Sequence, residues 1–202
     1  MNVTDKKRSF TAITLVLLAL LTITGAAGAS GNADLLPPSG ATDSPVASSR
    51  GFSTNFHYEY VAGAALRPRD SSSGWDYSGT GCVSRSSGSE LFNIYLGLPD
   101  GSRIDYLRIY YYDTSGSDST AWVTSYNSTG GYTDITTVQS AGTGGYGTKL
   151  SSYVGHVVDN SSRSYVLNWS AAQNGSSMRL CGLRVAYRVP TLDLFMPLIT
   201  KG

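Results

Sequence analysis

The stretch RIDYLRIYYY, residues 103–112, decides the fold class because Leu107 and Ile109 occupy alternate positions among polar and aromatic residues. Successive side chains of a β-strand point to opposite faces of a sheet. Leu107 and Ile109 therefore share one face, whereas Tyr110 and Tyr112 lie on the other. We expect the aliphatic pair to face a hydrophobic core and the two tyrosines to face away from it.

Similar period-two segments, separated by turn signals, lie on both sides of this stretch. Strands are expected at 56–66, 75–84, 90–98, 103–112, 120–126, 132–138, 150–158, 163–170 and 177–189, with a glycine-rich loop at 141–148. The sequence thus predicts an all-β protein, a single antiparallel β-sandwich of jelly-roll type with eight or nine strands. Its core is expected to contain Leu91, Ile94, Leu107, Ile109, Val123, Val166 and Val185.

The composition of the 202-residue chain excludes several other classes of protein. Charged residues make up 14%, against about 25% in an ordinary soluble domain. Glu59 and Glu90 are the only glutamates, which argues against a helical bundle. A net charge of +1 argues against nucleic acid as a partner, and 41% hydrophobic residues argue against a disordered chain.

The first 29 residues have the order of a secretory signal peptide. Lys6, Lys7 and Arg8 precede an uncharged apolar run at 10–24, and small residues follow at 27–29. Cleavage before Ser30 would leave no stable membrane span, and an uncleaved anchor is the alternative. We expect the mature protein, with a net charge near −1, to be secreted or to lie at the cell surface.

The remaining chain divides by composition into three parts. Residues 30–50 are rich in Ser, Pro and Ala and are expected to be a linker. Residues 51–190 form the expected β-sandwich domain, and residues 191–202 are an apolar tail. We expect the tail to dock on its own domain. The alternatives are an added strand on a neighbour, which would make an oligomer, and recognition by export or anchoring machinery.

Cys82 and Cys181 are the only cysteines in the chain. An even number of cysteines in an exported protein indicates a disulfide bond. The bond would join an early strand to the last one, side by side or face to face, and two free thiols are the alternative.

Four segments resemble a recurrent, uncharacterised all-β domain of secreted bacterial proteins. They are LPDG at 98–101, IDYLRIYYYD at 104–113, VDN at 158–160 and MRLCGLRVAYR at 178–188. The resemblance covers residues 60–188. It implies a sandwich fold and export, and it carries over no catalytic residue because the family has no assigned activity.

The motifs of common enzymes are missing from the sequence. Its two histidines, His57 and His156, form no zinc-binding motif, and there is no G-x-S-x-G, P-loop or dinucleotide fingerprint. We therefore expect no catalytic residues and no cofactor. Asp113 and Asp118 could supply oxygen ligands to calcium, but a turn held by their side chains is the favoured interpretation.

The aromatic residues near predicted loops and on the outer face are the candidate ligand-binding residues, since exposed rings stack on sugars or form interfaces. Two arginines beside Pro68 could add recognition of an acidic or hydroxylated ligand. The set comprises Trp75, Tyr77, Tyr110, Tyr112, Tyr126, Tyr132, Tyr146, Arg67 and Arg69.

Three functions remain open. The leading hypothesis is a secreted, non-catalytic β-sandwich module that binds a glycan or an envelope protein at the cell exterior. The second is a structural or assembly subunit of an extracellular layer or appendage that uses the apolar tail. The third is a hydrolase of an unrecognised type.

Overall fold

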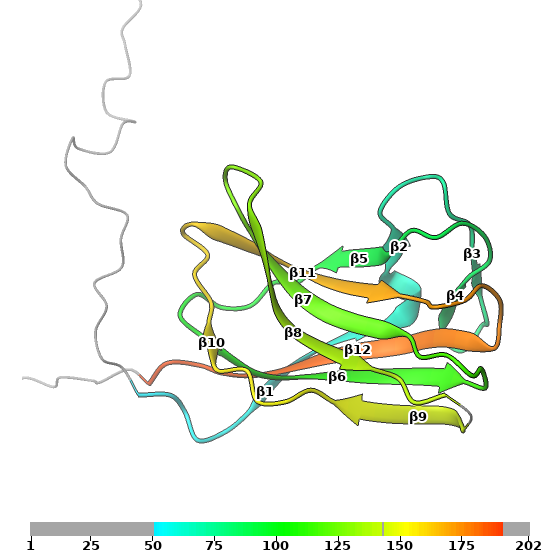
Figure 1. The fold of residues 1–202 in the computed structure, drawn as a ribbon. Helices are drawn as coiled ribbons and strands as arrows, with labels where there is room; N and C mark the ends of the chain where they lie inside the picture. Colours follow the sequence, from blue (N-terminus) through cyan, green and yellow to red (C-terminus); the bar gives the residue numbers. More distant parts are fainter. Residues whose placement is uncertain (1–50, 143, 192–202) are drawn as a thin grey trace, which may run out of the picture. The chain divides into compact units, whose positions relative to one another are not determined.

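Two antiparallel sheets pack face to face in the computed structural model, which describes residues 51–142 and 144–191 (Figure 1). The first sheet contains β1 (His57–Ala62), β3 (Trp75–Tyr77), β4 (Val83–Arg85), β6 (Arg103–Asp113), β9 (Gly145–Leu150), β10 (His156–Val157) and β12 (Met178–Arg188). The second sheet contains β2 (Arg67–Pro68), β5 (Phe92–Tyr95), β7 (Thr120–Asn127), β8 (Tyr132–Gln139) and β11 (Arg163–Ser170). A 3-10 turn, η2 (Gly63–Ala65), follows β1.

The eight principal strands have jelly-roll order. They run β1-β12-β6-β9 in the first sheet and β5-β11-β7-β8 in the second, so most connections cross from one sheet to the other. The other four strands have only two or three residues each and extend the sheet edges. The predicted all-β jelly-roll sandwich is confirmed, with twelve strands over the described residues in place of eight or nine.

The core lies between the sheets and is formed by the inward side chains of both. The expected core residues Leu107, Ile109, Val123 and Val185 are fully buried, and Ile94 packs against them half-buried. The prediction was wrong for two residues. Val166 is half-buried because Tyr165, Leu167 and Trp169 are the inward residues of β11, and Leu91 is half-buried because Phe92 fills the core position of β5.

The second half of the glycine-rich loop predicted at 141–148 is instead strand. β9 begins at Gly145 and pairs with β6, where Gly147 lies opposite Tyr111. A Cβ on Gly147 would lie 2.7 Å from the Tyr111 ring, so glycine is needed for the close approach of that ring. The strand expected at 150–158 is correspondingly wrong, because β9 ends at Leu150 and only the two residues of β10 pair farther along.

Three other expected strands are shorter or divided. The run at 56–66 ends as β1 at Ala62 and continues as the 3-10 turn, and the run at 90–98 is strand only over β5. The run at 75–84 is divided between β3 and β4, which pair with each other.

Two β-bulges interrupt the pairing of β6 with β12. Cys181 is the extra residue between the pairs Leu180–Tyr111 and Gly182–Tyr110. Asp105 is the extra residue between Ile104, paired with Tyr187, and Tyr106, paired with Ala186. A bulge resets the alternation of side chains, so residues an odd number apart come to share a face.

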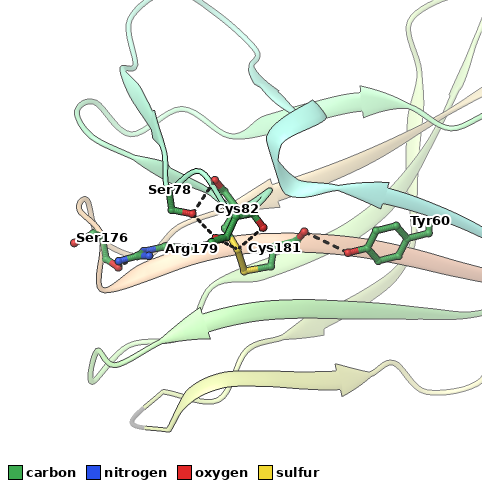
Figure 2. The surroundings of a disulfide bond; sticks show 7 residues. Tyr60, Ser78, Cys82, Ser176, Arg179 and Cys181 are labelled. Atoms are coloured by element: carbon green, nitrogen blue, oxygen red, sulfur yellow. Dashed lines mark hydrogen bonds between the residues drawn. A yellow bond between two sulfur atoms is a disulfide. The ribbon is translucent and has the colours of Figure 1, made fainter.

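The predicted disulfide between Cys82 and Cys181 is confirmed (Figure 2). The two Cα atoms are 3.9 Å apart, and the bond joins the residue before β4 to the bulge of β12, next to the pair Val83–Leu180. The cysteines therefore lie side by side in one sheet. In Figure 2 the Tyr60 hydroxyl points toward the Cys181 carbonyl oxygen, to which it donates at 3.4 Å.

The two ends of the domain meet. Phe52 forms an isolated bridge with Pro190, and the Thr191 N–H donates to the Gly51 carbonyl at 2.8 Å. The expected signal peptide (1–29), the linker up to residue 50 and the tail from residue 192 lie outside the described residues. Within 51–142 and 144–191, no helix has the length and apolar character required to cross a membrane.

Removing the disulfide should cost much of the domain's stability, because it closes a loop spanning 99 residues of sequence separation. The chain-entropy model gives about 4–5 kcal/mol for such a loop. We expect the double variant Cys82→Ala/Cys181→Ala to lose that order of unfolding free energy in urea denaturation. A loss below about 1 kcal/mol would contradict this entropic role for the bond.

His156 should make the fold sensitive to mild acid. Its Nε2 lies 3.1 Å from the hydroxyl of buried Tyr165, which also accepts a hydrogen bond from the Asp159 N–H at 2.9 Å. Burial, followed by the charge of Arg163, lowers the pKa of His156 below 6.5. The unfolded chain therefore binds a proton first, and this contribution to stability falls as pH drops below about 6.5.

The measurement is urea denaturation at pH 7.5 and pH 5.0. We expect the loss of unfolding free energy on acidification to be smaller in His156→Gln than in the unmodified chain. An equal loss in both proteins would show that His156 does not contribute.

Candidate binding face

The outward side of β9, β6, β12 and β1 carries a continuous set of aromatic and arginine side chains. Because Leu107, Ile109 and Tyr111 face the core, the residues between them on β6 point outward. We call this surface the tyrosine–arginine face. Its rings belong to Phe56, Tyr58, Tyr60, Tyr106, Tyr110, Tyr112, Tyr146 and Tyr153, and its cations to Arg103, Arg108, Arg179, Arg184 and Arg188.

The rings of this face meet in edge-to-face pairs across neighbouring segments. Ring centroids are 5.0 Å apart for Tyr112 and Tyr146, and 5.6 Å apart for Tyr60 and Tyr110. The ring of Tyr106 lies 5.8 Å from that of Tyr153. Such geometry is the favourable one for aromatic pairs, so neighbouring rings hold each other in place.

Guanidinium groups from β12 cover several of these rings. Arg179 lies 4.7 Å from the Tyr112 centroid, Arg184 lies 4.6 Å from that of Tyr58, and Arg188 lies 4.3 Å from that of Phe56. A guanidinium within about 6 Å of a ring face is attracted to it. The face therefore alternates planar rings with planar cations, both held in defined positions.

Small residues on β12 make room for the rings on either side. Gly182 lies beneath the Tyr60 ring, where a Cβ would come within 2.6 Å of Cζ. Ala186 pairs with Tyr58 on one side and with Tyr106 on the other. Rings from β1 and β6 can consequently approach each other over the central strand.

One end of the face offsets part of its positive charge. The Asp105 carboxylate, 1% exposed, lies 2.7 Å from Nε of Arg103 and 2.9 Å from Nε of Arg188. The hydrogen bond from Arg103 to Asp105 raises the pKa of that guanidinium further. A single carboxylate thus bridges two arginines that lie directly opposite each other on β6 and β12.

The opposite end of the face opens into a shallow polar depression of about 270 Å³. Arg179 lines it, with its Nε donating to the Ser176 carbonyl at 2.6 Å. Its other lining residues are Asp76, Tyr77, Ser78, Ser84 and Ser176.

The candidate binding residues from the sequence are distributed among three places. Tyr110, Tyr112 and Tyr146 come together on the tyrosine–arginine face. Tyr126 and Tyr132 pair across β7 and β8 on the other sheet, with centroids 6.1 Å apart. The remaining four, Trp75, Tyr77, Arg67 and Arg69, lie on or beside β2 and β3 at the edges of the two sheets.

Both predicted arginines of this third group already have partners. Arg67 donates to the carbonyls of Ala64 and Leu66, and its guanidinium lies 5.4 Å from the Tyr77 ring. Arg69 forms an ion pair with Glu90 at 3.0 Å. These contacts fit a structural role at the strand end.

The two candidate calcium ligands are occupied by turn hydrogen bonds. Asp113 is fully buried and accepts from the Ser115 N–H at 3.0 Å and the Ser140 hydroxyl at 2.7 Å. Asp118 accepts from the Gly142 N–H at 2.7 Å. Within the described residues, no three His, Cys, Asp or Glu side chains gather as a metal site would require.

The sequence interpretation named none of the five arginines of the face as candidates. Phe56, Tyr58 and Tyr60 could be read from their alternation, but strict alternation puts Arg179 and Arg184 on opposite faces. The bulge at Cys181 brings them to the same one.

Comparisons with protein-family models and with curated proteins find no match for this chain. Among solved structures, the isomaltodextranase of Arthrobacter globiformis T6 with panose matches at 17% identity and TM-score 0.42, over 63% of this chain and 23% of that one. The GH26-CBM35 mannanase of Podospora anserina matches at 13% and 0.42, over 67% and 28%. The chain thus spans only about a quarter of the length of these two enzymes.

The carbohydrate-binding module CBM36, solved with calcium and xylotriose, matches at 6% identity and TM-score 0.41, over 66% of this chain and 99% of that one. Similarity at this level concerns the all-β architecture alone.

Proposed function

We propose that this chain is a secreted, non-catalytic module that binds polysaccharide at the cell exterior through the tyrosine–arginine face. The observation that carries the proposal is the set of mutually braced tyrosine rings, interleaved with guanidinium groups, on the outside of one sheet. Ring faces stack on the apolar faces of sugars, and guanidinium N–H groups donate to sugar oxygens.

Exposure and shape both support an extended ligand. Tyr58 and Tyr60 are each 54% exposed and Tyr146 is 66% exposed, so these rings are accessible without rearrangement. β6 and β12 have 11 residues each, which corresponds to about 35 Å of strand. Small-molecule sites are usually enclosed clefts, whereas a surface of this length suits a polymer.

Tyrosine and arginine are also the residues enriched at the centres of protein–protein interfaces. An envelope protein is therefore the competing partner for this face, and the polysaccharide panel below distinguishes the two.

Export and lack of catalysis are part of the same proposal. The disulfide supports an oxidising compartment, where such bonds persist. His156 contacts the Tyr165 hydroxyl, and Asp159 accepts hydrogen bonds from hydroxyl groups of its own turn. These contacts support a structural role for both residues. Hydrogen bonds from the hydroxyls of Ser161 and Ser162 lower the pKa of Asp159 to about 2, so this carboxylate is a poor proton acceptor.

The test measures binding to a panel of polysaccharides by affinity electrophoresis, followed by calorimetry on the best ligand. Tyr60→Ala and Tyr110→Ala should each weaken binding about tenfold, which corresponds to ~1.4 kcal/mol. Gly182→Ala should weaken it too, because the new Cβ displaces the Tyr60 ring.

Tyr95→Ala is the matched control, since that ring is 66% exposed on the other sheet and should be dispensable. Binding to no polysaccharide in the panel, or an equal loss in the control, would overturn the proposal.

A further inference from the structure

Two arginines lie directly opposite each other at the centre of the tyrosine–arginine face. Arg108 of β6 and Arg184 of β12 are cross-strand partners in the register of the sheet. Like charges in directly opposite positions destabilise a sheet. This pair therefore needs a compensating negative charge, or another role that accounts for its cost.

The described chain supplies no carboxylate to this pair. Its ion pairs within 4.0 Å use Arg69, Arg103 and Arg188, over residues 51–142 and 144–191. Arg108 donates from one terminal nitrogen to the Thr148 hydroxyl at 3.2 Å, and its buried Nε has no acceptor among the described residues. A buried donor without an acceptor is costly, so an added acceptor at this position would be favourable. Among the described residues, the Nε of Arg188 also makes no hydrogen bond of good geometry, and what separates the two arginine pairs is the carboxylate 2.9 Å from Arg188.

The same two strands contain a second arginine pair, which provides an internal comparison. Arg103 and Arg188 are also direct cross-strand partners, and there the bulge at Asp105 places one carboxylate between the two guanidinium groups. At this second pair the protein itself therefore supplies a carboxylate that both arginines share. At Arg108 and Arg184 the carboxylate is missing, and the site opens outward.

The surroundings of the open pair suit a charged sugar. Arg184 lies 4.6 Å from the Tyr58 ring and 5.8 Å from the Tyr110 ring, which keeps its guanidinium plane in place. Tyr60, whose ring meets that of Tyr110, is the direct neighbour of Arg184 on β1. An anionic group at the arginines would put its sugar ring against these tyrosines.

We propose that Arg108 and Arg184 form the subsite for a carboxylate or sulfate group of an acidic polysaccharide. Planar guanidinium groups bind such oxyanions with paired, charge-assisted hydrogen bonds. The inference rests on the proposed function and names the ligand class of that same face. Nucleic acid is the competing anionic polymer, and the test includes it.

The experiment compares polygalacturonate and dextran sulfate with uncharged dextran and with a single-stranded DNA oligonucleotide, using the purified chain. Arg108→Gln and Arg184→Gln should each reduce affinity for the acidic polysaccharides at least tenfold, and added salt should weaken binding of the unmodified chain. The relative affinities for polygalacturonate and dextran sulfate identify which oxyanion is preferred.

Arg163→Gln is the matched control, because it removes one exposed arginine from the other sheet. Circular dichroism verifies folding of each variant.

Two results would overturn the inference while leaving the proposed function intact. The first result is that both arginine variants bind acidic polysaccharide as tightly as the unmodified chain, whereas Tyr60→Ala still weakens binding. The other is equal loss in Arg163→Gln, which would indicate a general charge effect. Binding of the oligonucleotide as tightly as of polygalacturonate would also overturn it.

Discussion

The pairing of β6 with β12 is the contact on which the rest of the structure depends. These two central strands present Leu107, Ile109, Leu183 and Val185 to the core and their arginines and tyrosines to the outside. Two bulges, at Asp105 and Cys181, adjust which residues reach each side. One bulge supplies the carboxylate that two arginines share, and the other provides the cysteine that is bonded to Cys82 beside β4.

Much of the fold could be predicted because burial imposes a simple period. Alternation at 103–112 located β6 and its inward residues Leu107 and Ile109, whereas the bulge at Asp105 turns Ile104 inward against strict alternation. Two cysteines in a chain predicted to be exported indicated one bond. The errors arose where the packing of large side chains overrode the structure expected from the local sequence. Glycines at 144–147 suggested a loop, yet Gly147 belongs to a strand because the Tyr111 ring occupies the space of a side chain. In β11, valine at 166 was expected inside, but the larger Tyr165 and Trp169 take the core.

The candidate site was predictable only in part, because its members come together through register. The triple tyrosine at 110–112 indicated an outer aromatic surface, and Tyr112 indeed meets Tyr146 there. Which arginines join that surface depends on a bulge, and one extra residue in a strand leaves no clear mark on hydrophobic alternation. Charge counting had the same limit, since it gave a nearly neutral chain and could not show five arginines on one face.

The central claim is that the tyrosine–arginine face is where the ligand binds, with its acidic group at Arg108 and Arg184. The most direct test is a nuclear magnetic resonance titration of the isotope-labelled chain with oligogalacturonate, following backbone amides and arginine Nε–H signals. The account predicts that the largest shifts fall on β6, β12 and β1 around these two arginines, with little change on β7, β8 and β11. Shifts concentrated on the second sheet, or arginine signals that do not move while the ligand binds, would contradict it.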